Sequence, residues 1–217
     1  MTTNLTGKGE TAAHTLAPWL KAIALFASTD ATLPALCAVR MEASATDRTL
    51  TLVATNRYVL GSVVLPWDGD DLTLALPAAS VKALLAVLTP AVKDYRRAVD
   101  TRVELAVLAD AGPPRLRVSL FGRDVITVDV ATDADSFPAT WRNLIPGVDA
   151  TGLLEGKVCL NPKYLALLSK LPDGAADRVS LRFTGDSRKP VVVTTKATGR
   201  ADVPFTGVIM PIRKAGE

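Results

Sequence analysis

The sequence repeats one pattern three times: a helical segment opened by proline and followed by three short strands. The helical segments are residues 17–28, 76–88 and 161–171, with Pro18, Pro77 and Pro162 placed near their first turns. Apolar residues recur in each segment at helical spacing, which predicts one buried face per helix. With a short strand expected before each helix, the pattern predicts an α+β fold built from three β-α-β-β-β units.

Such a unit must bury its single amphipathic helix against something. Units one and two can pair into a closed domain of roughly 130 residues, which is near the usual domain size. Unit three, of about 60 residues, is left without a twin and would bury too little surface alone. We therefore predict a two-unit domain at 1–134, a connector at 135–155 and a half-domain at 156–217, the last packing on another chain or on the connector.

The connector begins with the stretch DSFPATWRNLIPG, residues 135–147. Prolines at both ends argue against one long helix or a central strand. Its apolar side chains include Phe137 and Trp141, which are costly to leave in water. We expect the connector to be packed rather than free.

Composition favours a soluble protein of a reducing cytoplasm. The 217 residues are 48% apolar and 22% charged, so a real core is expected. Cys37 and Cys159 match no metal or redox spacing. The N-terminus is polar and no apolar run reaches the ~18 residues of a membrane helix, so no membrane partner is expected. A net charge of +3 is compatible with nucleic acid without demonstrating it.

Little in the sequence indicates catalysis. The single histidine, His14, is expected at the surface before the first helix, and no serine or cysteine has a histidine partner in its sequence context. No glycine-rich phosphate loop is present. Asp129, Asp133 and Asp135 lack the glycine and distal glutamate of a calcium loop, and we interpret them as a solvated strand end. We predict no enzyme activity, no metal and no cofactor.

Three regions carry a resemblance to one known family: TLTLVATNRYVLGSVVLP at residues 49–66, FPATWRNLIP at 137–146, and a C-terminal region with LNPKYLALLSKL, RKPVVV and GVIMPIRK. The family they resemble is the bacterial DNA sliding clamps (the beta subunit of DNA polymerase III). The first region resembles a strand, turn and strand of the clamp's middle domain. FPATWRNLIP resembles the connector between its second and third domains. LNPKYLALLSKL, RKPVVV and GVIMPIRK resemble the last half of its third domain. The resemblance spans residues 16–214 in order, but NRYV stands where the family shows Asp-Gly-His-Arg, and Lys214 replaces a usual terminal leucine.

The resemblance implies a DNA-clamp fold and a processivity factor that performs no chemistry. Clamp chains with six units close a ring as dimers, so four chains of three units would supply the same twelve. The implied partners are double-stranded DNA without sequence preference, the replicative DNA polymerase, a clamp loader, other proteins with clamp-binding motifs, and further copies of the chain. The implied location is the cytoplasm, at the nucleoid. One alternative is a non-ring clamp-like module that binds or mimics clamp partners, and another is an unrelated small-molecule-binding protein or enzyme.

The resemblance also implies two sets of site residues. A hydrophobic groove for partner peptides would be formed by residues of the turn, the connector and the C-terminal segment. These are Leu36, Thr55, Arg57, Tyr58, Val59, Leu60, Pro138, Asn143, Leu144, Pro190, Val191, Val208, Met210, Pro211, Ile212 and Arg213. The cations implied to face DNA are Lys21, Lys82, Lys93, Arg96, Arg97, Lys163 and Lys170. The ordinary alternative to DNA contact is that the cations form a solvated charged face. The ordinary alternative to a peptide groove is that its residues form a plain interdomain core.

Overall fold

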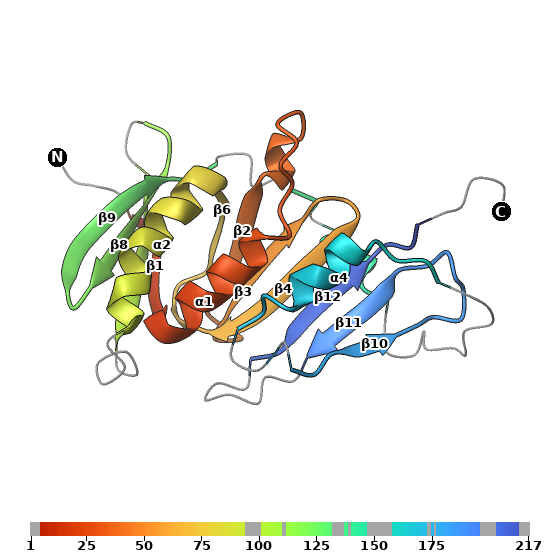
Figure 1. Ribbon diagram of the computed structural model, residues 1–217. Helices are drawn as coiled ribbons and strands as arrows, with labels where there is room; N and C mark the ends of the chain where they lie inside the picture. Colours follow the sequence, from red (N-terminus) through yellow and green to blue (C-terminus); the bar gives the residue numbers. More distant parts are fainter. Residues whose placement is uncertain are drawn as a thin grey trace.

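Two antiparallel sheets and one layer of helices make up the computed structural model of the chain (Figure 1). The structure describes residues 5–93, 101–109, 112–131, 137–138, 140–146, 158–172, 175, 177–195 and 203–212. The α+β class predicted from the sequence is confirmed.

Each of the two sheets combines runs of consecutive strands with strands from distant parts of the chain. Sheet A has the order β5 (Asp68–Gly69), β1 (Leu5–Ala12), β7 (Arg102–Leu108), β8 (Arg115–Leu120), β9 (Arg123–Asp129). Sheet B has the order β10 (Ser180–Arg182), β11 (Val191–Thr195), β12 (Phe205–Ile209), β4 (Val59–Pro66), β3 (Thr49–Thr55), β2 (Ala38–Ser44), β6 (Leu72–Pro77). The helices are α1 (Ala13–Ala24), α2 (Ala78–Lys93) and α4 (Pro162–Leu168), with short 3-10 turns η1 (Pro34–Leu36) and η3 (Trp141–Leu144).

The first two units exchange their opening strands. Strand β1 precedes α1 but pairs with β7, and β6 precedes α2 but pairs with β2. Each unit therefore completes the sheet of the other, which is how two amphipathic helices come to share one core.

The third unit extends sheet B. Strand β12 pairs antiparallel with β4, from Phe205 opposite Val63 to Ile209 opposite Val59. The opening strand expected for this unit is not formed by residues 158–160, which precede α4 as irregular chain. A strand needs a ladder of hydrogen bonds with a neighbouring backbone. Here the Ile212 amide donates to the Cys159 carbonyl at 2.8 Å, but the two stretches do not pair as strands.

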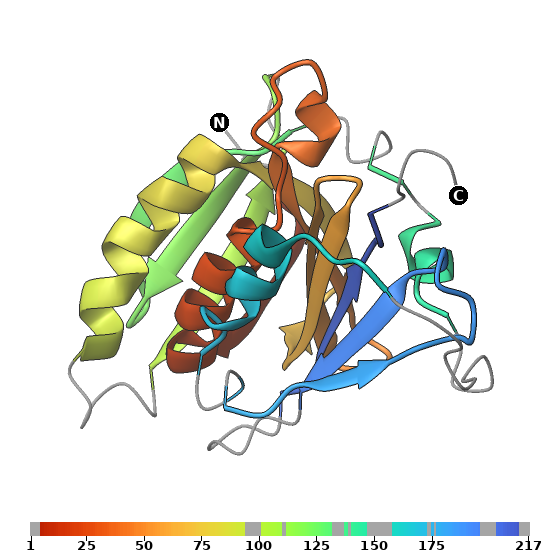
Figure 2. The same cartoon turned by 45° about the vertical axis from the view of Figure 1, so that its right-hand side comes forward.

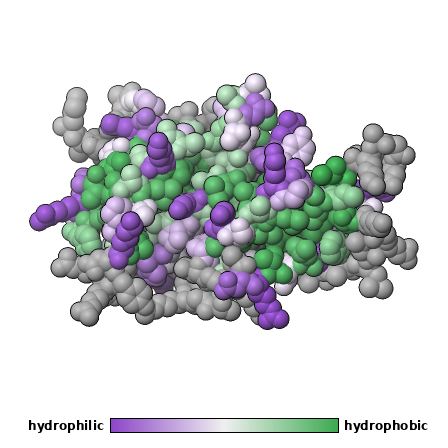
Figure 3. Space-filling view, in the orientation of Figure 1, coloured by the Kyte–Doolittle hydropathy of each residue, from purple (hydrophilic) through white to green (hydrophobic). Residues whose placement is uncertain are grey.

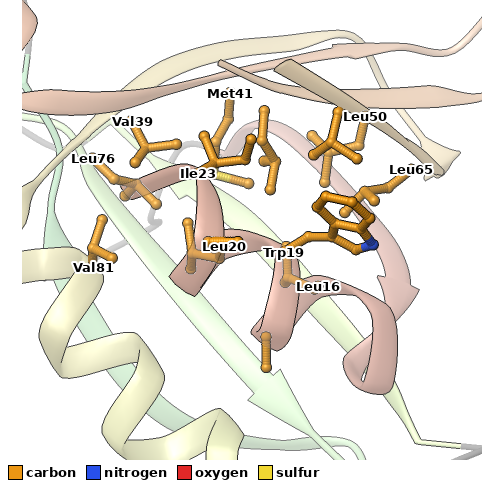
Figure 4. Close-up of a cluster of buried hydrophobic side chains, with 14 of the residues drawn as sticks. Leu16, Trp19, Leu20, Ile23, Val39, Met41, Leu50, Leu65, Leu76 and Val81 are labelled. Atoms are coloured by element: carbon orange, nitrogen blue, oxygen red, sulfur yellow. The ribbon is translucent and has the colours of Figure 1, made fainter. Parts of the chain in front are cut away.

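One core joins all three units. The helices cover the same face of the sheets (Figure 1), and Figure 4 shows Trp19, Leu20 and Ile23 of α1 pointing at side chains of sheet B. The cluster continues into the third unit through Leu168 and Phe205. The Phe205 ring stacks on Trp19 at 6.1 Å between centroids. The third unit thus contributes to the main core and has no separate one among the described residues.

The predicted helical segments 17–28, 76–88 and 161–171 correspond to α1 (Ala13–Ala24), α2 (Ala78–Lys93) and α4 (Pro162–Leu168), so their boundaries differ from the sequence prediction. Helix α1 begins at Ala13, whose amide donates to the Thr101 carbonyl at 2.9 Å. Pro18 is therefore inside the helix rather than near its first turn, and His14 lies within the helix rather than before it. Helix α2 starts directly after Pro77 as predicted but runs on to Lys93, with Pro90 inside it.

The described part of the connector, residues 137–138 and 140–146, packs on the face of sheet B opposite the helices, where Figure 2 shows η3. Phe137 and Trp141 are buried there against side chains of β3, β4 and β12. This second cluster consists of Leu36, Val53, Leu60, Phe137, Trp141 and Val208, with Leu33 and Ile145 at its margin. The connector is apolar because it seals the outer side of the junction between β4 and β12.

Candidate functional site

The turn between β3 and β4 presents Tyr58 to solvent. The Asn56 side chain accepts hydrogen bonds from the amides of Tyr58 and Val59, both at 3.0 Å. The Thr55 hydroxyl donates to the Val59 carbonyl at 2.8 Å and accepts from the Arg57 amide at 3.2 Å. Arg57 has a φ of +80°, a left-handed conformation that glycine adopts at least cost. Side-chain hydrogen bonds from neighbouring residues thus hold this turn where the resembling family has glycine.

Helix α4 brings a second tyrosine to the turn. Its N-cap is Asn161, whose side chain accepts from the Lys163 amide, and Pro162 follows as the first helical residue. The Tyr164 ring lies 6.4 Å from the Tyr58 ring, with an angle of 12° between the planes. The two rings form a stacked pair that joins unit one to unit three.

A pocket of about 520 Å³ lies beside this pair. The Met210 amide donates to the Tyr58 carbonyl at 2.8 Å, which holds the segment after β12 along one wall. Apolar walls, an adaptable methionine and a few polar groups suit a pocket that takes apolar side chains of a partner. We call it the tyrosine pocket; it is lined by Arg57, Tyr58, Asn161, Tyr164, Met210, Pro211 and Ile212.

The sequence-predicted groove residues fall into three groups. Arg57, Tyr58, Met210, Pro211 and Ile212 line the tyrosine pocket. Six others are buried and present little surface: Leu36, Thr55, Val59, Leu60, Val191 and Val208. Pro190 is half-buried, and Pro138, Asn143 and Leu144 of the connector are exposed but do not line the pocket. Arg213 lies outside the described residues.

Two lining residues were missed from the sequence. Tyr164 sits on the apolar stripe of its helix and was assigned to the core with the leucines around it. Asn161 was interpreted as a helix cap alone, and it serves as a cap as well as lining the pocket. A tyrosine among leucines was the available signal, because its hydroxyl favours a position at the edge of a core.

Glu42 of β2 fixes the connector to sheet B. Its carboxylate accepts from Arg142 Nη2 at 2.6 Å and from Trp141 Nε1 at 3.3 Å, and it also pairs with Arg40. Burial is the largest influence on the pKa of Glu42 and raises it. The hydrogen bonds from Arg142, Arg40 and Trp141 and the charge of Arg142 together outweigh burial, so this pKa lies below its usual value of 4.5.

The predicted DNA-facing lysines are all exposed on the helix layer. Lys21 lies on α1, Lys82 and Lys93 on α2, and Lys163 on α4, with Lys170 just after α4. Figure 3 shows separated hydrophilic side chains standing on this face amid a largely hydrophobic surface. Arg96 and Arg97 lie outside the described residues.

The described residues contain no group of three or more metal-ligating side chains. Of the predicted acidic cluster, Asp133 and Asp135 lie outside them. Cys37 and Cys159 are free thiols. No described helix is both long and apolar enough to cross a membrane.

Two solved structures share this fold. The DNA polymerase III beta subunit of Thermotoga maritima superposes with a TM-score of 0.70 and 16% identity, covering 99% of this chain and 67% of that chain. The DNA polymerase sliding clamp of Pseudomonas aeruginosa, solved with a ligand, superposes with a TM-score of 0.69 and 16% identity. This match covers 99% of this chain and 68% of that chain. No family model matches the sequence, and no curated protein matches it. The resemblance to bacterial sliding clamps is confirmed in the fold, and this chain spans about two thirds of the length of those clamps.

Proposed function

We propose that this protein is a sliding clamp: a processivity factor, without enzymatic activity, that encircles duplex DNA as a homo-oligomer and binds its partners in the tyrosine pocket. The observation that carries the proposal is the clamp fold over 99% of the chain, with the helices gathered on one face. The polymerase and other partners would insert apolar side chains into the pocket, and a clamp loader would open the ring. The site of action would be cytoplasmic, at the nucleoid.

The helix layer is the side proposed to face DNA. A sliding protein must attract phosphates without reading bases, and lysines do this as point charges. Five exposed lysines lie on this layer, on or next to α1, α2 and α4. Each phosphate that they neutralise would steepen the log–log salt dependence of binding by about 0.9.

The third unit is proposed to meet another copy. Strand β10 is the edge of sheet B among the described strands, and it is only three residues long. Leu165 and Leu181 are large apolar side chains left 37% and 43% exposed in this unit. A neighbouring chain that covered them would finish the half-domain, and four chains would supply the twelve units of a full ring.

Mass in solution, followed by retention on DNA, tests the ring. Light scattering should give a closed oligomer, and the protein should stay on nicked circular DNA at a salt concentration that lets it leave linear DNA of equal length. The variant Leu181→Asp should lower the mass and abolish the difference between the DNAs, whereas Thr194→Asp, at an exposed position of the adjacent strand, serves as the matched control. A monomer that leaves both DNAs equally would refute encirclement.

One observation favours the alternative, a non-ring module that binds clamp partners. The edge strand β9 carries a β-bulge and the charges of Arg123, Asp124 and Asp129. Bulges and charges are ways in which proteins protect an edge from pairing. A monomer that binds apolar peptides in the tyrosine pocket would support this module instead.

A further inference from the structure

The tyrosine pocket is one end of a longer groove. A second pocket of about 390 Å³ lies on the other side of the stacked tyrosines and shares Arg57, Tyr58 and Tyr164 with the first. A third pocket of about 280 Å³ lies between α1 and α2 and shares Leu25 and Ala27 with the second. Shared walls make the three concavities neighbours in a row, running from the segment after β12 to the start of α2.

The far end of this groove is apolar. The third pocket is walled by Val39, Leu76, Val81 and Leu85, which come from β2, β6 and α2. Leu25, directly after α1, stands between the second and third pockets and is 45% exposed. Leu25 shares the lining of the third pocket with these apolar walls, and a contiguous apolar patch of this kind is typical of an interaction surface.

The charges along the groove are mostly positive. Lys21 and Lys82 line the third pocket, and Arg57 and Lys163 line the second. None of these four cations has an ion pair among the described residues. The one carboxylate in the two linings, Asp30, accepts hydrogen bonds from Thr32, which together with the charge of Arg57 hold its pKa below the usual value, so Asp30 offsets part of the charge of Arg57. The groove is therefore complementary to a ligand that is both apolar and acidic.

We propose that the groove binds a partner segment longer than the tyrosine pocket can hold, an acidic peptide whose apolar side chains continue past Tyr58 and Leu25 into the hollow between α1 and α2. This proposal rests on the tyrosine pocket being a partner site, as proposed above. The acidic side chains pair with Lys21 and Lys82. The same lysines are proposed above to face DNA, so the peptide and the duplex would compete for them, but the duplex has no apolar side chain to place in the hollow between α1 and α2.

Fluorescence anisotropy with defined peptides tests the proposal. The short probe is six residues of leucine, phenylalanine and serine. Each long probe adds a tail of eight residues, about 26 Å when extended, to either end of the short probe. Three tails are compared: alternating Glu and Leu, Ser only, and alternating Lys and Leu. The Glu-Leu probe with its tail at one of the two ends should bind about tenfold more tightly than the short probe, which corresponds to about 1.4 kcal/mol. The Ser and Lys-Leu probes should show no such gain.

Substitutions in the third pocket test whether the gain in affinity of the Glu-Leu probe arises there. Lys21→Glu combined with Lys82→Glu should abolish it, and Leu25→Ser should reduce it without changing charge. Lys93→Glu is the matched control, because it makes the same charge reversal at the far end of α2, outside the pocket linings. An equal loss in the Lys93→Glu and Lys82→Glu single variants would show general attraction of anions, as duplex DNA would, and would overturn the proposal.

The two proposals fail separately. Ile212 lines the tyrosine pocket but neither of the other two pockets. The variant Ile212→Asp should therefore weaken binding of the short probe and leave unchanged the gain in affinity that the tail gives. Binding of the short probe without any gain from the Glu-Leu tail at either end would overturn the extended groove and leave the partner pocket standing. If the short probe does not bind at all, the tyrosine pocket is not a partner site. Titration with the Glu-Leu tail alone then shows whether the third pocket binds an acidic, apolar peptide.

Discussion

Phe121 is held in a conformation that its side chain does not favour. It has a φ of +53° and is followed by Gly122 at +72°, in the two-residue turn between β8 and β9. Positive φ at both positions is the geometry of a type I′ hairpin turn, for which Asn-Gly is the preferred pair. The ring is 68% exposed, so it contributes little to the core.

Phe121→Asn should therefore stabilise the protein by about 0.5–1 kcal/mol, since asparagine tolerates the left-handed region and phenylalanine does not. Thermal unfolding followed by circular dichroism would measure the change. Phe121→Ala is the control, because it removes the ring but keeps a residue that disfavours positive φ. A destabilised Phe121→Asn variant would show that the exposed ring makes a contact that stabilises the protein.

The pairing of Glu42 with Arg142 should make the connector sensitive to acid. The pKa of Glu42 is below its usual value of 4.5 in the folded protein, so ionised Glu42 stabilises the fold above pH 4.5. This contribution is lost as the pH falls through the lower folded pKa. Glu42→Gln should cost about 1–2 kcal/mol at pH 7, because hydrogen bonds to a charged acceptor are lost and Arg142 is partly screened by water.

The measurement is the difference in melting temperature between the parent and Glu42→Gln proteins from pH 7 to pH 3. We expect a constant difference down to about pH 5 and a shrinking one below it, where the parent carboxylate becomes protonated. A difference that stays constant down to pH 3 would mean that the charge of Glu42 plays no part.

At the scale of elements, the connector behaves as part of sheet B. The prolines indicated correctly that it is neither a long helix nor a strand, and its apolar residues indicated that it is packed. Its partners could not be predicted, because Val53, Leu60 and Val208 come from three strands whose neighbours are set by topology. The same difference between local and distant signals applies to the helix starts. The start of α4 could be predicted from Asn161 and Pro162, whereas the start of α1 depends on the Thr101 carbonyl, which is distant in the chain.

Trp141→Ala should release the connector. The side chain is 3% exposed, and replacing a buried tryptophan by alanine typically costs about 3–5 kcal/mol. Limited proteolysis should cut the variant within residues 137–146 much faster than the parent protein. Arg142→Ala, beside it on η3, keeps the indole and should show a smaller effect; equal rates for Trp141→Ala and the parent would contradict the docking.

At the scale of the whole molecule, the third unit and the first two should unfold together. Phe205 of β12 is 1% exposed and contacts Trp19 and Phe26, so the core of unit one passes into unit three without a break. Calorimetry should show one transition for the parent protein. Phe205→Ala should lower its midpoint as a single transition, by about 3–5 kcal/mol of stability.

Leu144→Ala is the matched control, because that side chain is 49% exposed on η3 and lines none of the pockets described above, so its loss should change the midpoint little. Two separate transitions in the parent protein would show that the units are independent.

The local signals in this sequence determined the helices, most strands and their order, because periodicity, prolines and turn residues act within a few neighbours of the chain. The resemblance to sliding clamps, and not these local signals, placed Arg57, Tyr58, Met210, Pro211 and Ile212 among the sixteen implied groove residues, and these five line the tyrosine pocket. Only the tertiary structure decided that β1 and β6 cross between sheets, that residues 158–160 form no strand, and that Tyr164 stacks on Tyr58 at the edge of the core. Strand pairing and side-chain stacking depend on which distant segment arrives alongside, and that choice is made by the burial of the whole core.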